Sequence, residues 1–138
     1  MDKFNLFFDG CSKGNPGDSG AGAVIYQGNL ELYSRTLFVG KNITNNVSEY
    51  TGLIIGLELA LENGIRELAV NGDSLLVIKQ MNGEYKVKAP ALKILHLKAK
   101  ELSAQFDTIT FTHVYRENNQ RADELSNIAL NNVTSVNN

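Results

Sequence analysis

The stretch Lys3-Phe4-Asn5-Leu6-Phe7-Phe8-Asp9 is rich in aromatic residues and ends at an acidic one. Such a run is typical of a β-strand, and the polar, glycine-rich residues 10–20 that follow predict a long turn. Two more strand-like segments, residues 22–26 and 30–39, are joined by the short link Gln27-Gly28-Asn29. The N-terminal part of the chain therefore predicts three antiparallel strands, because short links of this kind connect neighbouring strands.

The apolar residues change to a helical spacing after Val47. They occupy both sides of this helix, which predicts that it is largely buried and ends at Asn63-Gly64. The rest of the chain predicts a strand at 65–70, helices at 73–82 and 90–106, a strand at 108–115 and a helix at 119–131. A strand that returns after a helical crossover pairs in parallel, so the fourth strand is expected beside the first. The sequence thus predicts an α/β fold, in which a five-stranded mixed sheet of three antiparallel strands and two crossover strands is flanked by helices.

The composition fits one globular domain. The chain has 138 residues, of which 43% are hydrophobic, and this is enough for a single core. We expect the domain to span residues 1–131 and residues 132–138 to form a disordered tail. The single cysteine, Cys11, excludes an internal disulfide and a structural zinc site. Without an apolar run of roughly 20 residues or an N-terminal signal, the sequence predicts a cytoplasmic protein with no membrane segment. We also expect a monomer.

Four acidic residues are spaced to share one edge of the predicted sheet. Asp9 and Asp73 follow the first and fourth strands, and open α/β sheets bind ligands at the carboxyl ends of their strands. Glu49 and Asp123 lie near the starts of helices that follow polar turns, which could bring them to the same edge. Each acid taken singly has a plainer interpretation as a turn residue, a helix cap or a surface charge.

Clustered carboxylates repel one another, and bound metal offsets this repulsion. Oxygen ligands without histidine or cysteine indicate Mg²⁺, for which Mn²⁺ can substitute. Two such ions about 4 Å apart would activate water for phosphodiester hydrolysis without a covalent nucleophile. The formal net charge of −2 is low for a protein that binds nucleic acid, but bound ions would supply positive charge where phosphate binds.

The motifs around these acids resemble the type 1 ribonuclease H family in four blocks and in the family's order. The blocks are Asp9-Gly10 with Gly14-Asn15-Pro16-Gly17, Thr44-Asn45-Asn46 with Glu49, Asp73-Ser74, and Arg121-Ala122-Asp123-Glu124-Leu125. The resemblance covers nearly the whole chain and implies a ribonuclease H-like fold. It also implies an endoribonuclease that hydrolyses the RNA strand of RNA/DNA hybrids by a two-metal-ion mechanism, leaving 5′-phosphate and 3′-hydroxyl ends.

The resemblance further assigns roles to individual residues. The implied catalytic residues and metal ligands are Asp9, Glu49, Asp73 and Asp123. In the family, small polar groups of the first two blocks detect ribose 2′-hydroxyls in the minor groove. The residues that match these positions are Cys11, Ser12, Asn15, Asn45 and Asn46, and Gly10 of the first block is also implied to bind substrate. Thr44 is implied to hold a phosphate of the DNA strand, and Arg116 is a candidate for a phosphate or product contact.

Three features depart from the family pattern. The run over 83–90 is too short for the basic helical insertion with which many relatives grip the DNA strand, and the chain has no tryptophan. Leu75 stands where relatives often have a glutamine that touches the minor groove. His113 falls in an alternating strand and not in a loop before the last aspartate. We therefore expect His113 to be packed or hydrogen-bonded and not to act in proton transfer.

Two other functions stay open at this point: a non-catalytic hybrid-binding module, and another nuclease of the same fold such as a junction resolvase. The presence of all four acids argues against the first. The paired Asn45 and Asn46, together with Asn15, suit recognition of 2′-hydroxyls and argue against the second. A P-loop nucleotide hydrolase is disfavoured, because the glycine-rich segment lacks the Gly-Lys-Ser/Thr ending.

Overall fold

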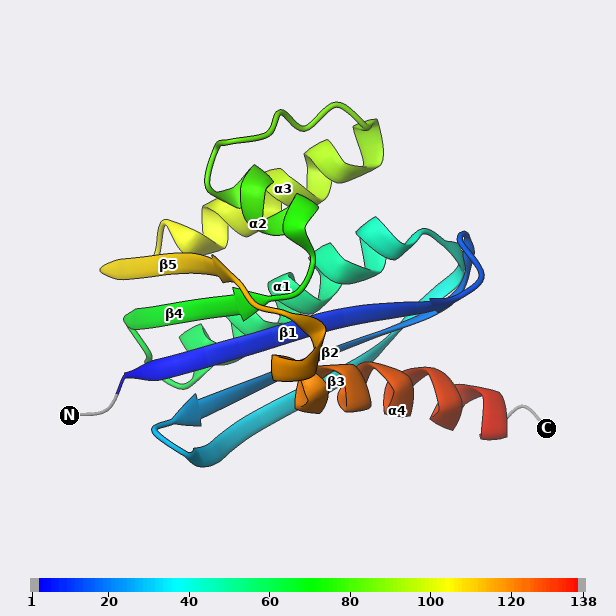
Figure 1. The fold of residues 1–138 in the computed structure, drawn as a ribbon, viewed down its shortest axis with the longest axis horizontal. Helices are drawn as coiled ribbons and strands as arrows, with labels where there is room; N and C mark the ends of the chain where they lie inside the picture. Colours follow the sequence, from blue (N-terminus) through cyan, green and yellow to red (C-terminus); the bar gives the residue numbers. More distant parts are fainter. Residues whose placement is uncertain (1–2, 137–138) are drawn as a thin grey trace.

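The computed structural model describes residues 3–136 of the chain, with side chains through residue 132. Its strands are β1 (Phe4–Lys13), β2 (Gly17–Gln27), β3 (Leu30–Ile43), β4 (Glu67–Gly72) and β5 (Thr108–His113). They form one sheet in the order β3-β2-β1-β4-β5 (Figure 1). The first three strands pair antiparallel, whereas β4 pairs in parallel with both β1 and β5. The predicted five-stranded mixed sheet, with the fourth strand beside the first, is confirmed.

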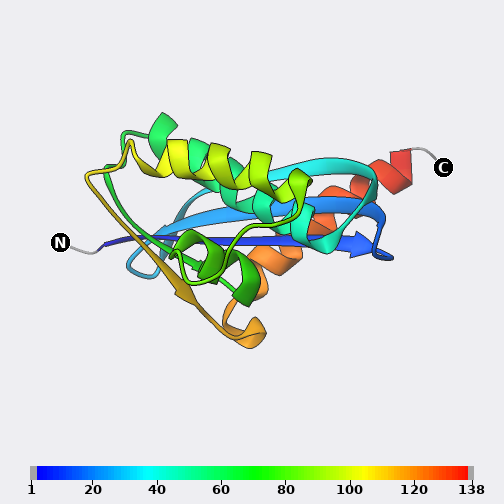
Figure 2. The ribbon, with the colours of Figure 1, turned by 90° about the horizontal axis from the view of Figure 1, so that it is seen from above.

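Helices cover both faces of this sheet (Figures 1 and 2). They are α1 (Asn45–Glu62), α2 (Leu75–Met81), α3 (Pro90–Ser103) and α4 (Gln120–Val136), and a 3₁₀ turn, η1 (Arg116–Asn118), precedes α4. The first three helices pack in one hydrophobic cluster with Leu6 and Phe8 of β1. On the opposite face, Ala122 and Leu125 of α4 pack against Val24 of β2. Successive side chains of the strands thus point to opposite faces of the sheet and pack in two separate layers.

The helix α1 lies at the centre of the larger cluster. Tyr50, Leu53 and Leu57 are fully buried on it. The helix begins at a cap, because the Thr44 side chain accepts a hydrogen bond of 3.3 Å from the backbone N–H of Val47. The prediction that this helix is largely buried is confirmed.

Two glycines allow α1 to lie directly on β1. A Cβ atom at Gly52 would collide with the backbone of Asp9, and one at Gly10 would collide with the backbone of Ser48 and Glu49. Backbone atoms cannot rotate away from such a collision, so a side chain at either position would force the helix and the strand apart. The first turns of α1 are therefore held against the middle of β1.

The hairpin between β1 and β2 is tighter than predicted. The long turn expected over residues 10–20 is wrong, because β1 continues to Lys13 and β2 begins at Gly17. Ladder pairing between these strands, which extends to the partners Lys13 and Asp18, satisfies the backbone groups and outweighs the low strand propensity of glycine. The strand β3 likewise continues to Ile43, past the expected end at residue 39.

The last helix is also longer than predicted. The sequence placed its end at residue 131, whereas α4 continues through Val136. The disordered tail predicted over 132–138 stays a prediction for residues 137–138, which lie outside the described residues. The expected helix over 73–82 begins later, at Leu75, because Ser74 serves as its cap.

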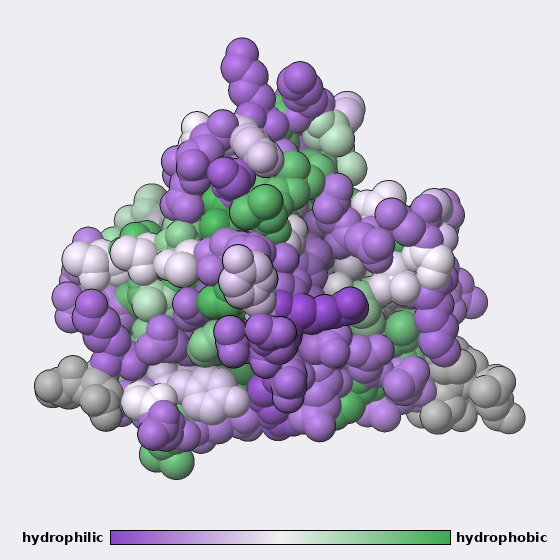
Figure 3. Space-filling model, viewed as in Figure 1, coloured by the Kyte–Doolittle hydropathy of each residue, from purple (hydrophilic) through white to green (hydrophobic). Residues whose placement is uncertain are grey.

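The surface on the α4 side is mainly hydrophilic, with small apolar patches between polar ones (Figure 3). Leu30, the first residue of β3, is an exposed hydrophobic side chain. Among the helices that the structure describes, none is both long enough and apolar enough to span a membrane.

Replacing Gly52 with alanine is expected to lower the free energy of unfolding by about 3 kcal/mol, the upper part of the usual range for overpacked sites. The sign of this change in unfolding free energy is diagnostic, because alanine at an open helix position is more stabilising than glycine by about 1 kcal/mol. Urea unfolding of the purified chain measures this change. Gly56→Ala is the matched control and should cost less, because its two shortest contacts would be with the ends of the Leu6 side chain, which can move, and the third, with the Cβ of Ala23, is longer at 3.1 Å. A Gly52→Ala variant as stable as the parent would contradict the close approach of α1 and β1.

Candidate active site

The acids of the two central strands lie where those strands separate. β1 and β4 pair in parallel as far as Phe8 and Gly72, and Asp9 and Asp73 are the next residue of each chain segment. Ser74 then caps α2, and the chain leaves the sheet. Both carboxylates line the cavity that opens at this point. Asp9 and Asp73 thus meet at one edge as predicted, although Asp9 lies within β1 and not at its end.

Glu49 reaches the same place from the first turns of α1. Its Oε1 accepts a hydrogen bond of 2.5 Å from the backbone N–H of Gly10. The side chain is 6% exposed, and its Oε2 is buried without a hydrogen-bond partner in the part of the chain that the structure describes. A buried carboxylate oxygen is costly unless a proton or cation binds it. Asp9, Glu49 and Asp73 each offer an oxygen that lies within 4.8 Å of the other two.

Asp123 approaches the site from the opposite face of the sheet. It lies in the first turn of α4 and lines the same cavity, whose volume is about 600 Å³. Its Oδ1 accepts a hydrogen bond of 3.2 Å from the Asn127 side chain. Among the described residues, the compact group of mutually close oxygens comprises Asp9, Glu49 and Asp73, and Asp123 stands beside it. The structure therefore gathers all four predicted acids around one cavity and three of them into a tight group.

The acids perturb one another strongly. Burial raises the pKa of Asp9 to about 7; the adjacent carboxyl of Glu49 lowers that pKa, and the charges of Asp73 and Asp123 raise it. Burial also holds the pKa of Glu49 well above its ordinary value, and its contact with Asp9 adds to the rise. Asp9 and Glu49 can therefore share a proton near neutral pH. A divalent cation bound to these oxygens would displace that proton, so the binding of a metal here would be coupled to proton release.

The residues predicted to contact substrate fall into two groups. Those that line the cavity with the acids are Gly10, Cys11, Ser12, Asn45, Asn46 and Arg116. Asn15 and Thr44 instead hold the start of α1. The side-chain oxygen of Asn15 accepts a hydrogen bond of 2.9 Å from the backbone N–H of Asn45, and Thr44 caps the helix. Asn15 and Thr44 therefore support the segment that carries the paired asparagines.

Three more residues, which were not predicted from the sequence, also line the cavity. They are Ser74, His113 and Tyr115. His113 lies in a strand as predicted, but at its last residue, where the ring reaches the cavity and packs edge-on against Tyr115 at 5.7 Å between ring centroids. Tyr115 is 70% exposed. The available signal was the alternation over 108–115, which places Tyr115 on the same side as His113.

Comparison with known proteins identifies the family. Residues 7–129 match the family described as reverse transcriptase-like. The chain is 44% identical over 126 residues to a bifunctional protein of Mycobacterium tuberculosis and 38% identical over 128 residues to ribonuclease HI of Halobacterium salinarum. These alignments cover 88% and 93% of this chain. They cover 34% and 64% of the two relatives, so the chain spans only part of the length of either.

Solved structures share the whole arrangement. The crystal structure of ribonuclease H1 from Halobacterium salinarum is similar with a TM-score of 0.90 and 38% identity, over 94% of this chain and 98% of that one. A ribonuclease H1 isolated from compost, solved in complex with an RNA/DNA hybrid, is similar with a TM-score of 0.90 and 37% identity, over 96% and 99% of the two chains. With the sheet order, the acidic group and these similarities in agreement, the chain belongs to the type 1 ribonuclease H family.

Proposed function

We propose that this domain is a metal-dependent endoribonuclease that hydrolyses the RNA strand of RNA/DNA hybrids and leaves 5′-phosphate and 3′-hydroxyl ends. The observation that carries the proposal is the group of Asp9, Glu49 and Asp73, whose oxygens lie within 4.8 Å of one another beside a cavity. Acids held this close favour a bound cation, which in turn attracts a phosphodiester. The hybrid bound to a similar ribonuclease H1 supports the same class of substrate.

Mg²⁺ is the metal that fits this donor set best. Asp9, Glu49 and Asp73 present carboxylate oxygens, the ligands that hard cations prefer, and the Oε2 of Glu49 is buried without a hydrogen-bond partner among the described residues. Mn²⁺ can substitute because it accepts the same ligands. Asp123, which stands beside the group, is the residue available to a second ion. When bound, a pair of such ions supplies Lewis acidity and activates a water for attack on phosphorus.

The chain's own groups bind and orient the substrate. The guanidinium of Arg116 lines the cavity and offers the charge and the hydrogen-bond donors that a phosphate of the RNA strand requires. The groups that can read ribose 2′-hydroxyls in the minor groove, the feature that separates RNA from DNA, belong to Cys11, Ser12, Asn45 and Asn46. The net charge of −2 leads us to expect weak, salt-sensitive binding.

We assign this activity to residues 1–131, which include every residue that lines the cavity, and we expect the domain to act as a monomer. The free Cys11 agrees with a reducing, cytoplasmic location. The chain spans about a third of the length of its relative from Mycobacterium tuberculosis, so the proposal concerns the activity of this domain.

The proposal is tested by incubating the purified chain with labelled RNA/DNA hybrid, double-stranded RNA, double-stranded DNA and branched DNA. Each substrate is combined with Mg²⁺, Mn²⁺ or a chelator. Cleavage confined to the RNA of the hybrid and abolished by the chelator is the expected result. Hybrid binding without cleavage under either metal would instead identify a non-catalytic module, and cleavage of branched DNA would identify a junction resolvase.

Asp73→Asn is expected to lower kcat on the hybrid by more than about 100-fold, because it removes a proposed metal ligand. Substitution of a residue that only orients a metal ligand already lowers metal affinity or activity by about 10- to 100-fold. Steady-state kinetics on a labelled hybrid measures the loss. Asp107→Asn is the matched control: Asp107 is exposed and precedes β5, at the opposite edge of the parallel strands, and its substitution should leave kcat unchanged. Equal loss in the two variants would refute the assignment of Asp73.

Asp9→Asn is expected to stabilise the metal-free protein at pH 8 by at most about 4 kcal/mol. The pKa of Asp9 in the folded protein, about 7, lies above its ordinary value of 3.8. The stability that Asp9 contributes is therefore complete below pH 3.8 and is lost as the pH rises through 7. Asparagine carries no such titration, so the two proteins should differ little at pH 3.5 and most at pH 8. Urea unfolding in chelator at both pH values checks this, and a less stable variant at pH 8 would contradict the raised pKa.

A further inference from the structure

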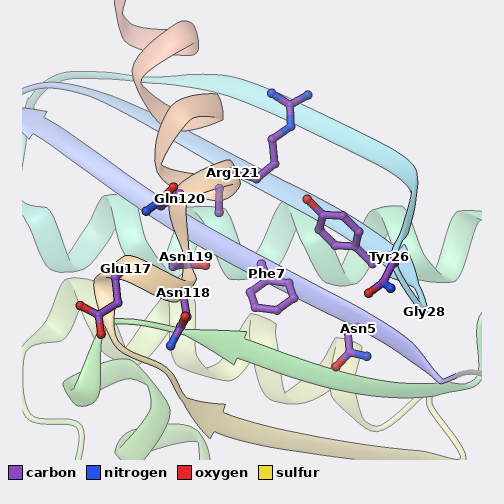
Figure 4. A pocket seen from close by; sticks show the side chains of 11 residues that line it. Asn5, Phe7, Tyr26, Gly28, Glu117, Asn118, Asn119, Gln120 and Arg121 are labelled. Carbon is purple, nitrogen blue, oxygen red and sulfur yellow. The ribbon is translucent and has the colours of Figure 1, made fainter.

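Asn119 is a buried polar residue that the proposed mechanism does not use. It lies between η1 and α4 and is 1% exposed. Figure 4 shows it against β1 beneath the start of α4, where it lines a second cavity together with Phe7 and Tyr26. A buried amide requires explanation, because its donors and acceptor lose their hydrogen bonds to water.

The amide nitrogen of Asn119 connects two parts of the acidic site. It donates one hydrogen bond of 2.9 Å to the backbone carbonyl of Phe8, the residue before Asp9, and one of 3.2 Å to Oδ2 of Asp73. Both partners are acceptors, so the amide group can have only one orientation, with its nitrogen toward the site. The Oδ1 atom then faces away, and it is buried without a partner among the described residues.

This pair of contacts suits asparagine in particular. The two partners require two N–H donors on one short, uncharged group, whereas a serine or threonine hydroxyl has one hydrogen and a lysine or arginine would place a charge there. The unpartnered Oδ1 is a cost that a smaller apolar residue would avoid. The backbone of Asn119 also accepts a hydrogen bond of 3.1 Å from the N–H of Asp123. One residue therefore ties the end of the β1–β4 pairing to Asp73 and to the turn that carries Asp123.

We infer that Asn119 is a positioning residue that fixes the carboxylate of Asp73 for metal binding, an inference that rests on the proposed metal-dependent function. Without this contact Asp73 is free to rotate away from Asp9 and Glu49, whose negative charges repel it. The hydrogen bond from Asn119 opposes that rotation and is anchored at Phe8, beside Asp9. Partners of this kind, which orient the ligands of a metal, change metal affinity or activity by about 10- to 100-fold when they are removed.

The test compares Asn119→Ala with Asn71→Ala. Asn71 is a matched control, because its amide also joins β4 to β1, with hydrogen bonds of 3.2 Å to the Leu6 carbonyl and 3.3 Å to the Asn5 side chain, but it contacts no acid of the site. Mn²⁺ affinity is measured by calorimetry on each folded protein without substrate, and unfolding by urea gives the stability. Both variants should lose stability. Asn119→Ala alone should bind Mn²⁺ about 10- to 100-fold more weakly and show a lower kcat with little change in KM.

Equal Mn²⁺ affinity in Asn119→Ala and the parent chain would overturn the inference, as would an equal loss of affinity in Asn71→Ala. If Asn119→Ala does not fold, Asn119→Ser replaces it: a single hydroxyl donor cannot serve both acceptors, so Mn²⁺ affinity should fall between those expected for the parent and for alanine. Parental affinity in this variant would equally overturn the inference. A parent chain that binds Mn²⁺ but cuts no hybrid would refute the proposed nuclease and leave the affinity comparison as the test of Asn119.

Discussion

Asp9, Glu49 and Asp73 repel one another in a place where burial already disfavours two of their charged forms, so the backbone must hold them together. It does so by direct contact of α1 with β1, which the missing side chain of Gly52 permits. The parallel pairing of β1 and β4 adds Asp73 from the other side. Acids on flexible surface loops would relax apart. The backbone segments that carry these three acids cannot move apart, and a shared proton or a bound cation relieves the repulsion between the carboxylates.

On the other face of the sheet, a helix also packs directly on a strand at a glycine. A Cβ atom at Gly20 would collide with the backbone of Ser126 in α4, so this helix also lies directly on its strand. Arg121 joins the start of α4 to β3 through an ion pair of 2.9 Å with Glu31, and it also pairs with Glu124 within α4. Such exposed pairs are worth little each, and the packing of Leu125 on the sheet does more to hold the helix. The cavity therefore receives acids from rigid elements on both faces.

Much of this arrangement could be predicted from local features of the sequence. Apolar spacing gave the order of the elements, and the motifs around the four acids indicated a family and hence a substrate. The extent of the β1–β2 hairpin could not be predicted, because pairing of distant backbone groups overrides the turn preference of residues 10–20. Asn119 and Tyr115 were missed for a related reason. A polar residue before a helix is ordinary in sequence, and only the fold places the Asn119 amide on Asp73 and the Tyr115 ring beside the cavity.

If these carboxylates together bind divalent ions, anomalous X-ray scattering from a crystal soaked in Mn²⁺ will locate the ions among them. We expect an anomalous peak about 2 Å from oxygens of Asp9, Glu49 and Asp73, with α1 still in contact with β1. A peak only at other residues, or no peak in this group at saturating Mn²⁺, would contradict it.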